Sequence, residues 1–315
     1  MEQQMTDMYD FEKIFGDFEH VHHIRQETPE GDIRITLYPV VPGIYLALNE
    51  VHATTAPSTD IIPVSECITI NHCLDGRCEF KLSESNYSYV CAGLTCIGCS
   101  PVAGGFYYPS AYYLGYEIYI FPEMFTLQTT QLLQGASIDM DRLLTNMQCR
   151  TDARIGISSE DVRSVWKHLL QADREDLGYA RLCTGLLLHA YCHGSPLASP
   201  GLINLTREQA EWSKQAHDIL TADLSRHIAM REIAGRLHVS ETSLKKYFRM
   251  VYGRNVSDYM HERRMQYAAG RLLETDDSIA DIAAAAGYCN QGRFAKIFRE
   301  YAGMKPLEYR RLGRS

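Results

Sequence analysis

The 315-residue sequence has no hydrophobic run that approaches the roughly 20 apolar residues needed to span a bilayer. Its first segment, Met1 to Asp17, carries acidic side chains and no apolar core, so it does not match a secretory signal. These two absences argue against a membrane-spanning or exported protein. We expect a cytoplasmic protein with no membrane partner.

The sequence also lacks a recognisable metal or disulfide framework. Its ten cysteines lie in a long chain without an export signal, so most are expected to be reduced and buried. Two pairs, Cys73 with Cys78 and Cys96 with Cys99, could form half of a zinc or redox site. Neither pair is followed by a second C-x2-C or an H-x3-H. We therefore expect no metal or cofactor, and a redox or metal-sensing role remains the alternative.

The net charge of −8 is the sum of a basic and an acidic part of the chain. Residues 216–315 contain 17 Lys or Arg against 12 Asp or Glu, a net +5, and the rest contains 14 against 27, a net −13. A basic part joined to an acidic part is expected when only the basic part meets phosphate. The length suits two domains rather than one small core.

One pattern occurs twice between Met230 and Gly303. In each copy a short apolar helix reaches a tight turn, a capping side chain begins a second helix, and a glycine ends it. The capping residues are Ser240 and Asn290, and the glycines are Gly253 and Gly303. This is the pattern of a helix-turn-helix, present twice.

The second helix of each copy has two chemically different faces. The apolar stripes are Leu244, Tyr247, Phe248 and Val251 in the first copy and Phe294, Ile297, Phe298 and Tyr301 in the second. Lys, Arg and small polar residues occupy the opposite faces, as suits a helix in the DNA major groove. A single such face would more often be a solvated surface, but its occurrence in both copies favours DNA binding.

The C-terminal part of the chain resembles the AraC/XylS family of transcription regulators. The matching features, in order, are Ile233-Ala234, Ser240, Leu244, Phe248, Gly253, Arg264 within Tyr259 to Met265, Ala268, Leu272-Leu273, Ile279, Ile282-Ala283, Gly287-Tyr288, Phe294, Phe298, Gly303, Pro306 and Tyr309-Arg310. The resemblance implies a sequence-specific DNA-binding regulator, not an enzyme, in which residues 257–274 form a long helix that bridges two helix-turn-helix units. The implied partners are double-stranded promoter DNA and RNA polymerase.

The resemblance also implies which side chains contact DNA. They are Thr242, Ser243, Lys245, Lys246 and Arg249 in the first unit and Gln291, Arg293, Lys296 and Arg299 in the second. Gly292 and Ala295 place small side chains where the second helix should read bases, so we expect weaker or shape-based readout there. We expect Arg264, in the bridging helix, to be a structural clamp rather than a base reader.

Residues 31–122 consist of short alternating or apolar runs separated by Pro, Gly, Asn and Asp, which predicts an all-β domain. The expected strands are 33–41, 43–51, 66–72, 77–82, 87–91, 94–98, 104–108 and 113–121, with Asp75-Gly76 as a hairpin turn. The segment is similar to the cupin-like sensor barrel of many family members, which implies a small-molecule effector. One alternative is a metal-binding cupin, although only His52 and His72 offer imidazoles there. Another is a barrel that only dimerises.

Residues 123–193 have helical periodicity, with helices expected over 138–147, 158–171 and 175–192. The spacing of Phe11, Ile14, Phe15 and Phe18 predicts a further short helix. We interpret the stripe of Leu182, Leu186 and Leu187 as core, with a homodimer interface as the alternative.

The predicted fold class is α+β. It consists of an N-terminal sensor or dimerisation domain at 1–193, with a cupin-like β-barrel at 31–122 and helices at 123–193. A linker rich in Pro and Gly follows at 194–205. An all-α domain of the AraC type occupies 206–315 and begins at a capping box, Thr206 to Gln209.

Overall fold

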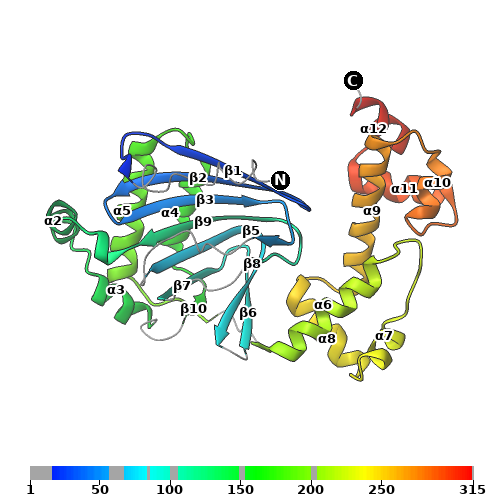
Figure 1. Ribbon diagram of the computed structural model, residues 1–315, viewed down its shortest axis with the longest axis horizontal. Helices are drawn as coiled ribbons and strands as arrows, with labels where there is room; N and C mark the ends of the chain where they lie inside the picture. The colour runs from blue at the N-terminus through cyan, green and yellow to red at the C-terminus, as the bar shows by residue number, and fades with distance from the viewer. Residues whose placement is uncertain are drawn as a thin grey trace, which may run out of the picture. The chain divides into compact units, whose positions relative to one another are not determined.

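The computed structural model describes residues 16–56, 67–83, 86–99, 106–148, 153–199 and 204–313. The chain divides into two compact units, Met1–Asn204 and Leu205–Ser315 (Figure 1). The short helix predicted from Phe11 to Phe18 lies, except for its end, outside the described residues. Within the described ranges, no helix combines the length and apolar character needed to cross a membrane.

The first unit is built on an antiparallel sheet with neighbouring strands in the order β1-β2-β3-β9-β5. Pairing continues from β5 to both β6 and β7, and β7 pairs with β10, while β4 and β8 form a separate two-stranded sheet. The strands are β1 (His22–Thr28), β2 (Gly31–Val41), β3 (Ile44–Val51), β4 (Thr55–Ala56), β5 (Ile68–Ser83), β6 (Asn86–Cys91), β7 (Thr95–Cys99), β8 (Phe106–Tyr107), β9 (Tyr113–Ile120) and β10 (Arg154–Gly156).

Alternation along β9 gives the sheet two faces. Tyr116, Ile118 and Ile120 are buried in the core cluster that includes the helices, whereas Tyr113 and Glu117 are buried on the other side. The second face packs apolar residues of β2, β3, β5 and β6 against residues of the β4 and β8 region. Both faces of the sheet are therefore covered, and Glu117 lies on the face away from the helices.

Three helices, α3 (Met140–Met147), α4 (Glu160–Gln171) and α5 (Leu177–His193), lie against one face of the sheet (Figure 1). Trp166 of α4 and Leu187 of α5 are fully buried in the core that they share with the sheet. Asp139 and Asp176 fix where α3 and α5 begin, because each side chain accepts a hydrogen bond from a backbone N–H of the first turn.

The prediction of a hairpin at Asp75-Gly76 is wrong, because β5 continues through these residues from Ile68 to Ser83. The pairing of β5 with β9 slips by one residue between Cys73 and Asp75, which makes a β-bulge. Gly76 has a φ of +79°, and a Cβ at this position would lie 2.2 Å from the carbonyl oxygen of Tyr112. The Asp-Gly pair therefore supplies the positive φ of a bulge rather than of a turn.

Other predicted boundaries also differ from the structure. The sheet begins at β1, before residue 31, and this largely polar strand pairs along its whole length with β2. η1 (Pro122–Met124) and α2 (Leu127–Gly135) were not predicted. α4 begins at Glu160 rather than Ser158, since the Ser158 hydroxyl is buried 2.8 Å from Thr95 Oγ1. Part of the predicted linker belongs to the first unit, because Ala198 and Ile157 exchange two backbone hydrogen bonds of 2.9 Å.

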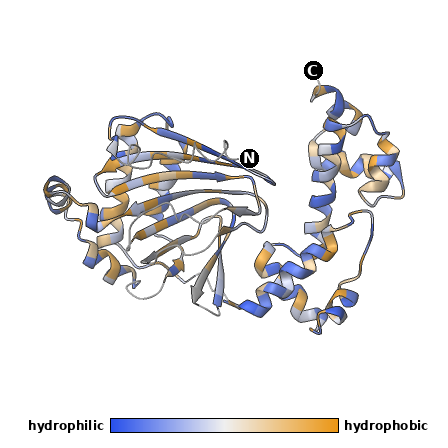
Figure 2. Cartoon of the chain, in the orientation of Figure 1, coloured by the Kyte–Doolittle hydropathy of each residue, from blue (hydrophilic) through white to orange (hydrophobic). Residues whose placement is uncertain are grey.

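The second unit is helical apart from β11 (Leu205–Thr206), and apolar and polar residues alternate around its helices (Figure 2). Thr206 and Gln209 form the predicted capping box, with hydrogen bonds of 3.2 and 3.0 Å between side chains and backbone. The helices are α6 (Arg207–Thr221), α7 (Met230–Arg236), α8 (Glu241–Tyr252), α9 (Val256–Glu274), α10 (Ile279–Ala285), α11 (Gln291–Ala302) and α12 (Pro306–Leu312). The predicted bridging helix is α9.

Candidate nucleic-acid interface and the hollows of the first unit

α7 and α8 form a short helix pair joined by a tight turn. His238 takes a φ of +53° in this turn, and the Ser240 side chain then caps α8 by accepting from Ser243 N at 3.1 Å. Gly253 ends α8 with a φ of +76°. The buried side of α8, including Leu244 and Phe248, packs against α6, α7 and α9. The pair is thus fixed by its apolar face, and the opposite face of α8 stays in solvent.

α10 and α11 repeat this arrangement. Gly287, with a φ of +83°, occupies the turn position that His238 occupies in the first pair. Asn290 caps α11 by accepting from Arg293 N at 2.8 Å, and Gly303 ends it with a φ of +75°. Phe294 and Phe298 are fully buried, as predicted.

Tyr301, which was predicted to lie inside, is 43% exposed. Its ring contacts the ring of Phe298, with centroids 6.2 Å apart, and the remainder faces solvent. A tyrosine tolerates this position because its hydroxyl can remain hydrated.

The predicted DNA-contacting side chains lie on the outer faces of α8 and α11. Thr242, Lys245, Lys246, Arg249, Gln291, Arg293, Lys296 and Arg299 are all exposed, and Ser243 is half-buried at the cap of α8. Lys245 Nζ lies 2.6 Å from Glu241 Oε1 one turn earlier. Within the described part of the chain, the other five cations of this set form no ion pair with a carboxylate. Each helix therefore offers uncompensated positive charge to solvent.

Arg264 of α9 clamps backbone groups, as expected, and does not lie on the exposed basic faces. Its Nε donates to Leu224 O at 3.0 Å and its Nη2 to Arg226 O at 2.9 Å. Its Nη1 lies 3.2 Å from Nδ1 of His227, whose Nε2 lies 3.0 Å from Gly287 O. The side chain is 9% exposed, and burial lowers the pKa of the guanidinium. Arg264 thereby fastens the connection before α7 and the turn after α10 to the same helix.

A second guanidinium has a comparable role near the end of the chain. Arg310 of α12 donates from Nη2 to Asp277 O at 2.6 Å and from Nε to Leu272 O at 3.3 Å. It thereby holds the end of α9 and the connection that leads into α10. No sequence pattern pointed to His227, because a histidine in a connection between helices belongs to no periodic pattern.

The first unit contains a cavity of about 80 Å³ on the sheet face opposite the helices. Glu117 of β9 reaches it and is 5% exposed. Its Oε2 accepts from Tyr119 Oη at 2.7 Å and from Asn49 Nδ2 at 3.2 Å, and the Asn71 side chain also hydrogen-bonds the carboxylate. Burial raises the pKa of Glu117, against the lowering effect of these hydrogen bonds. We did not predict Glu117, although one acid among the apolar and aromatic residues of its strand was a usable signal.

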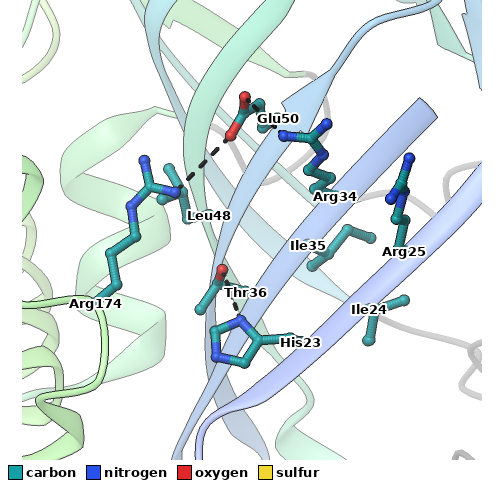
Figure 3. A pocket seen from close by; sticks show the side chains of 9 residues that line it. All are labelled: His23, Ile24, Arg25, Arg34, Ile35, Thr36, Leu48, Glu50 and Arg174. Atoms are coloured by element: carbon teal, nitrogen blue, oxygen red, sulfur yellow. Dashed lines mark hydrogen bonds and ion pairs between the residues drawn. The ribbon is translucent and has the colours of Figure 1, made fainter. Parts of the chain in front are cut away.

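A larger hollow, of about 360 Å³, lies between β1 to β3 and the connection from α4 to α5 (Figure 3). Arg34 and Arg174 point toward Glu50 from opposite sides, each with a guanidinium nitrogen 3.9 Å from a carboxylate oxygen. His23 Nε2 lies 2.8 Å from Glu175 Oε1. Both arginine side chains are 52% exposed, so this is a solvated, charged groove rather than an enclosed site.

Three cysteines of the sheet are core residues. Cys73, Cys78 and Cys96 are buried and reduced, and burial raises the pKa of the Cys73 and Cys78 thiols well above the usual range. Such thiols are poor nucleophiles at neutral pH. Among the described residues, no three His, Cys, Asp or Glu side chains converge as metal ligands. His52 lies beside the ring of Tyr112, and His72 stacks on Trp166.

The geometry of the second unit defines a class: a helical module with capped helix pairs and exposed basic faces is a DNA-binding domain. A family described as a helix-turn-helix domain matches residues 233–312. This part of the chain is therefore similar to the helix-turn-helix domains with which transcription regulators bind DNA.

Similar proteins match about a third of the chain. The transcriptional activator RhaR of Yersinia pseudotuberculosis is 32% identical over 91 residues, which are 29% of this chain and 31% of RhaR. The transcriptional activator FapR of Escherichia coli is 31% identical over 98 residues, which are 31% of this chain and 37% of FapR. A solved transcriptional regulator with an AraC-type domain from Chromobacterium violaceum is 25% identical, with a TM-score of 0.31, and the match covers 33% of this chain and 92% of that one. The chain therefore spans about a third of the length of these curated relatives.

Proposed function

We propose that the whole protein is a sequence-specific transcription regulator that binds double-stranded promoter DNA through the second unit. The observation that carries the proposal is the exposed, uncompensated basic face on each of two equally capped helices, α8 and α11. The relatives RhaR and FapR are named transcriptional activators, which supports activation through RNA polymerase as the mode of action. The role is one of binding and not of catalysis.

Each helix pair acts in this proposal as one helix-turn-helix unit. α8 and α11 enter successive major grooves, so the two elements that they read lie about 10 base pairs apart. Thr242, Lys245 and Lys246 contact bases from α8. Gln291, Arg293 and Lys296 occupy the base-edge positions of α11, where readout is weaker and depends more on DNA shape. Ser243 lies at the N-terminal end of α8, and Arg249 and Arg299 bind phosphates from the last turn of each helix.

We further infer that the first unit is a cupin-like sensor whose effector controls DNA binding. The support is a sheet covered on both faces, with a partly open, mostly apolar cavity, reached by Glu117, on the face away from the helices. Ligand sites are typically concave and mostly apolar, with a few convergent polar groups, and this cavity has that character.

A homodimer through α5 completes the proposal. Leu182 and Leu186 are 69% and 59% exposed, one turn apart on this helix, whereas Leu187 is fully buried. The prediction that all three leucines belong to the core is therefore wrong for Leu182 and Leu186, which face solvent, and right for Leu187, which packs inside. Changing Leu182 and Leu186 to Asp should reduce the sedimenting mass to that of a monomer, and an unchanged mass would remove α5 from the interface.

Selection from random duplex DNA by the full chain tests the function. The enriched sequences should contain two elements with centres about 10 base pairs apart. The variant Lys246→Ala with Lys296→Ala should enrich them less strongly, and the control Lys167→Ala, on an exposed face of α4, should not differ from the native chain. Enrichment of no sequence would contradict the proposal.

A further inference from the structure

The cavity at Glu117 contains a carboxylate for which the described residues provide hydrogen bonds but no opposite charge. Its hydrogen-bond donors, Tyr119, Asn49 and Asn71, are all neutral. Among the residues that the structure describes, no Lys, Arg or His lies within ion-pair distance of it. Segments 57–66 and 100–105, next in sequence to β4 and β8, contain no Lys, Arg or His.

The titratable groups that face Glu117 are neutral acids. They are Tyr119 and Tyr113 from β9, Tyr108 after β8, and Cys78 from β5. Burial raises the pKa of each of these groups well above its usual range, so none becomes charged near neutral pH. Among the described residues near this cavity, Glu117 is therefore the group whose charge can change under ordinary conditions.

The sheet is shaped to keep this polar group in place. Tyr113 Oη donates to Asn71 Oδ1 at 2.9 Å, and Asn71 in turn bonds the carboxylate. Gly115 makes room for this arrangement, because a Cβ there would lie 2.3 Å from Tyr113 Oη. A buried carboxylate without a counter-ion costs several kcal/mol when it is charged, and an apolar residue would fill a plain core better. In the part of the chain that the structure describes, the cavity lacks a positive charge rather than another hydrogen-bond donor.

We propose that this cavity binds the ammonium group of a small protonated amine, with Glu117 as its counter-ion. The inference rests on the proposed effector-controlled function and names the chemical class of the effector. A cavity of about 80 Å³ matches two or three water molecules at ~30 Å³ each, which suits an ammonium head and a short chain. Ile33, Ile35, Val51 and Phe106 line the same cavity and would contact the methylene groups.

Amine binding by this route favours the release of a proton. Burial raises the pKa of Glu117, so its carboxyl holds a proton more readily in the empty cavity than in water, and an arriving ammonium group stabilises the carboxylate and favours loss of that proton to solvent. The amine itself stays protonated, since alkylammonium groups titrate near 10. Affinity should therefore rise with pH and level off above the raised pKa of Glu117.

Calorimetric titration of the full chain without DNA tests the proposal, with methylammonium, propylammonium and butane-1,4-diammonium chlorides as probes. At least one should bind, more tightly as the pH rises from about 5 to about 8, while sodium chloride and propan-1-ol should not bind. Glu117→Gln should weaken binding at least tenfold. Glu50→Gln, in the separate groove of Figure 3, should leave it unchanged. Binding that is equal in Glu117→Gln, or absent for all three amines, would overturn the proposal.

A second variant keeps the test decisive if Glu117→Gln does not fold. Tyr119→Phe removes one donor that favours the charged carboxylate, so the pH midpoint of binding should move upward. An unmoved midpoint would contradict the role of Glu117. DNA binding is measured separately by mobility shift, so that failure of the proposed ligand can be told apart from failure of the proposed function. Amine binding that leaves DNA binding unchanged would refute effector control. DNA binding without amine binding would refute only the ligand class.

Discussion

At the scale of single residues, Arg264 holds the helix pairs of the proposed DNA-binding surface in place without being part of that surface. Two carbonyl oxygens, of Leu224 and Arg226, depend on its guanidinium for their hydrogen bonds. Arg264→Lys keeps the charge but cannot reach both carbonyls, so we expect a loss of about 2 kcal/mol in the free energy of unfolding. Urea denaturation followed by circular dichroism measures this loss.

The matched control is Arg263→Lys, one residue earlier on α9, where the guanidinium bonds the nearby Gln266 side chain. It should change the stability by less than about 0.5 kcal/mol. Equal losses in the two variants would mean that Arg264 contributes charge alone.

His72 is a second buried residue with a measurable signature. It stacks on Trp166 and lies 2.9 Å from Thr95 Oγ1, and burial lowers its pKa to about 4, with a smaller contribution from Arg163. The unfolded chain binds a proton at this imidazole below about pH 6.5, and the folded chain does not. Stability should therefore be complete above about pH 6.5 and fall, by about 3 kcal/mol in all, as the pH decreases to about 4.

His72→Phe retains a ring beside Trp166 and removes the titration. The free energies of unfolding of the two proteins, measured by urea denaturation at pH 7 and at pH 4.5, should converge as the pH falls. A constant difference between the curves would show that His72 titrates normally.

At the scale of elements, the two units differ in how much their sequence predicts. Ser240, Asn290, Gly253 and Gly303 act on the helix that each adjoins, so capped helices were readable from local spacing. The strands are different, because Asp75-Gly76 takes its conformation from β9, far away in the chain. The cavity at Glu117 was missed for the same reason, since side chains of β3, β5 and β9 meet only after the strands pair.

The bulge in β5 offers a paired test. Gly76 and Gly93 both have a positive φ, +79° and +83°, but a Cβ would clash with backbone at Gly76 and meets nothing within 4 Å at Gly93. Gly93→Ala should cost about 1 kcal/mol of stability from backbone strain alone, and Gly76→Ala clearly more. Urea midpoints of the two variants provide the comparison, and equal midpoints would mean that the bulge relaxes freely.

The two recognition helices should divide the work of reading DNA. α8 carries a continuous polar face, whereas Gly292 and Ala295 interrupt that of α11. A side chain that donates to guanine discriminates among bases by about 1 to 3 kcal/mol, and a small one cannot. Lys245→Ala should therefore relax base preference at one element of the site. Lys296→Ala should weaken binding to all sequences evenly and flatten the salt slope by about one unit. The reverse pattern in a random-DNA selection would contradict these roles.

At the scale of the whole molecule, charge and fold divide the chain in the same way. The basic net charge of residues 216–315 falls in the helical unit, and the acidic remainder falls mainly in the unit with the sheet. The negative charge of the first unit should disfavour non-specific association with DNA, and the positive charge of the second unit should favour binding to DNA. The second unit has its own buried core around Phe294, Phe298 and Leu272, so it should fold and bind DNA without the first.

The most direct test of this account is a mobility-shift titration of the segment Thr206 to Ser315 with duplex DNA at a series of salt concentrations. We predict binding whose affinity falls steeply and linearly on logarithmic axes as salt rises, because each phosphate contact releases condensed counterions. The variant with Lys246, Arg249, Lys296 and Arg299 changed to Ala should give a clearly smaller slope. An absence of binding, an affinity independent of salt, or an unchanged slope in the variant would contradict the claim that these two helices bind DNA.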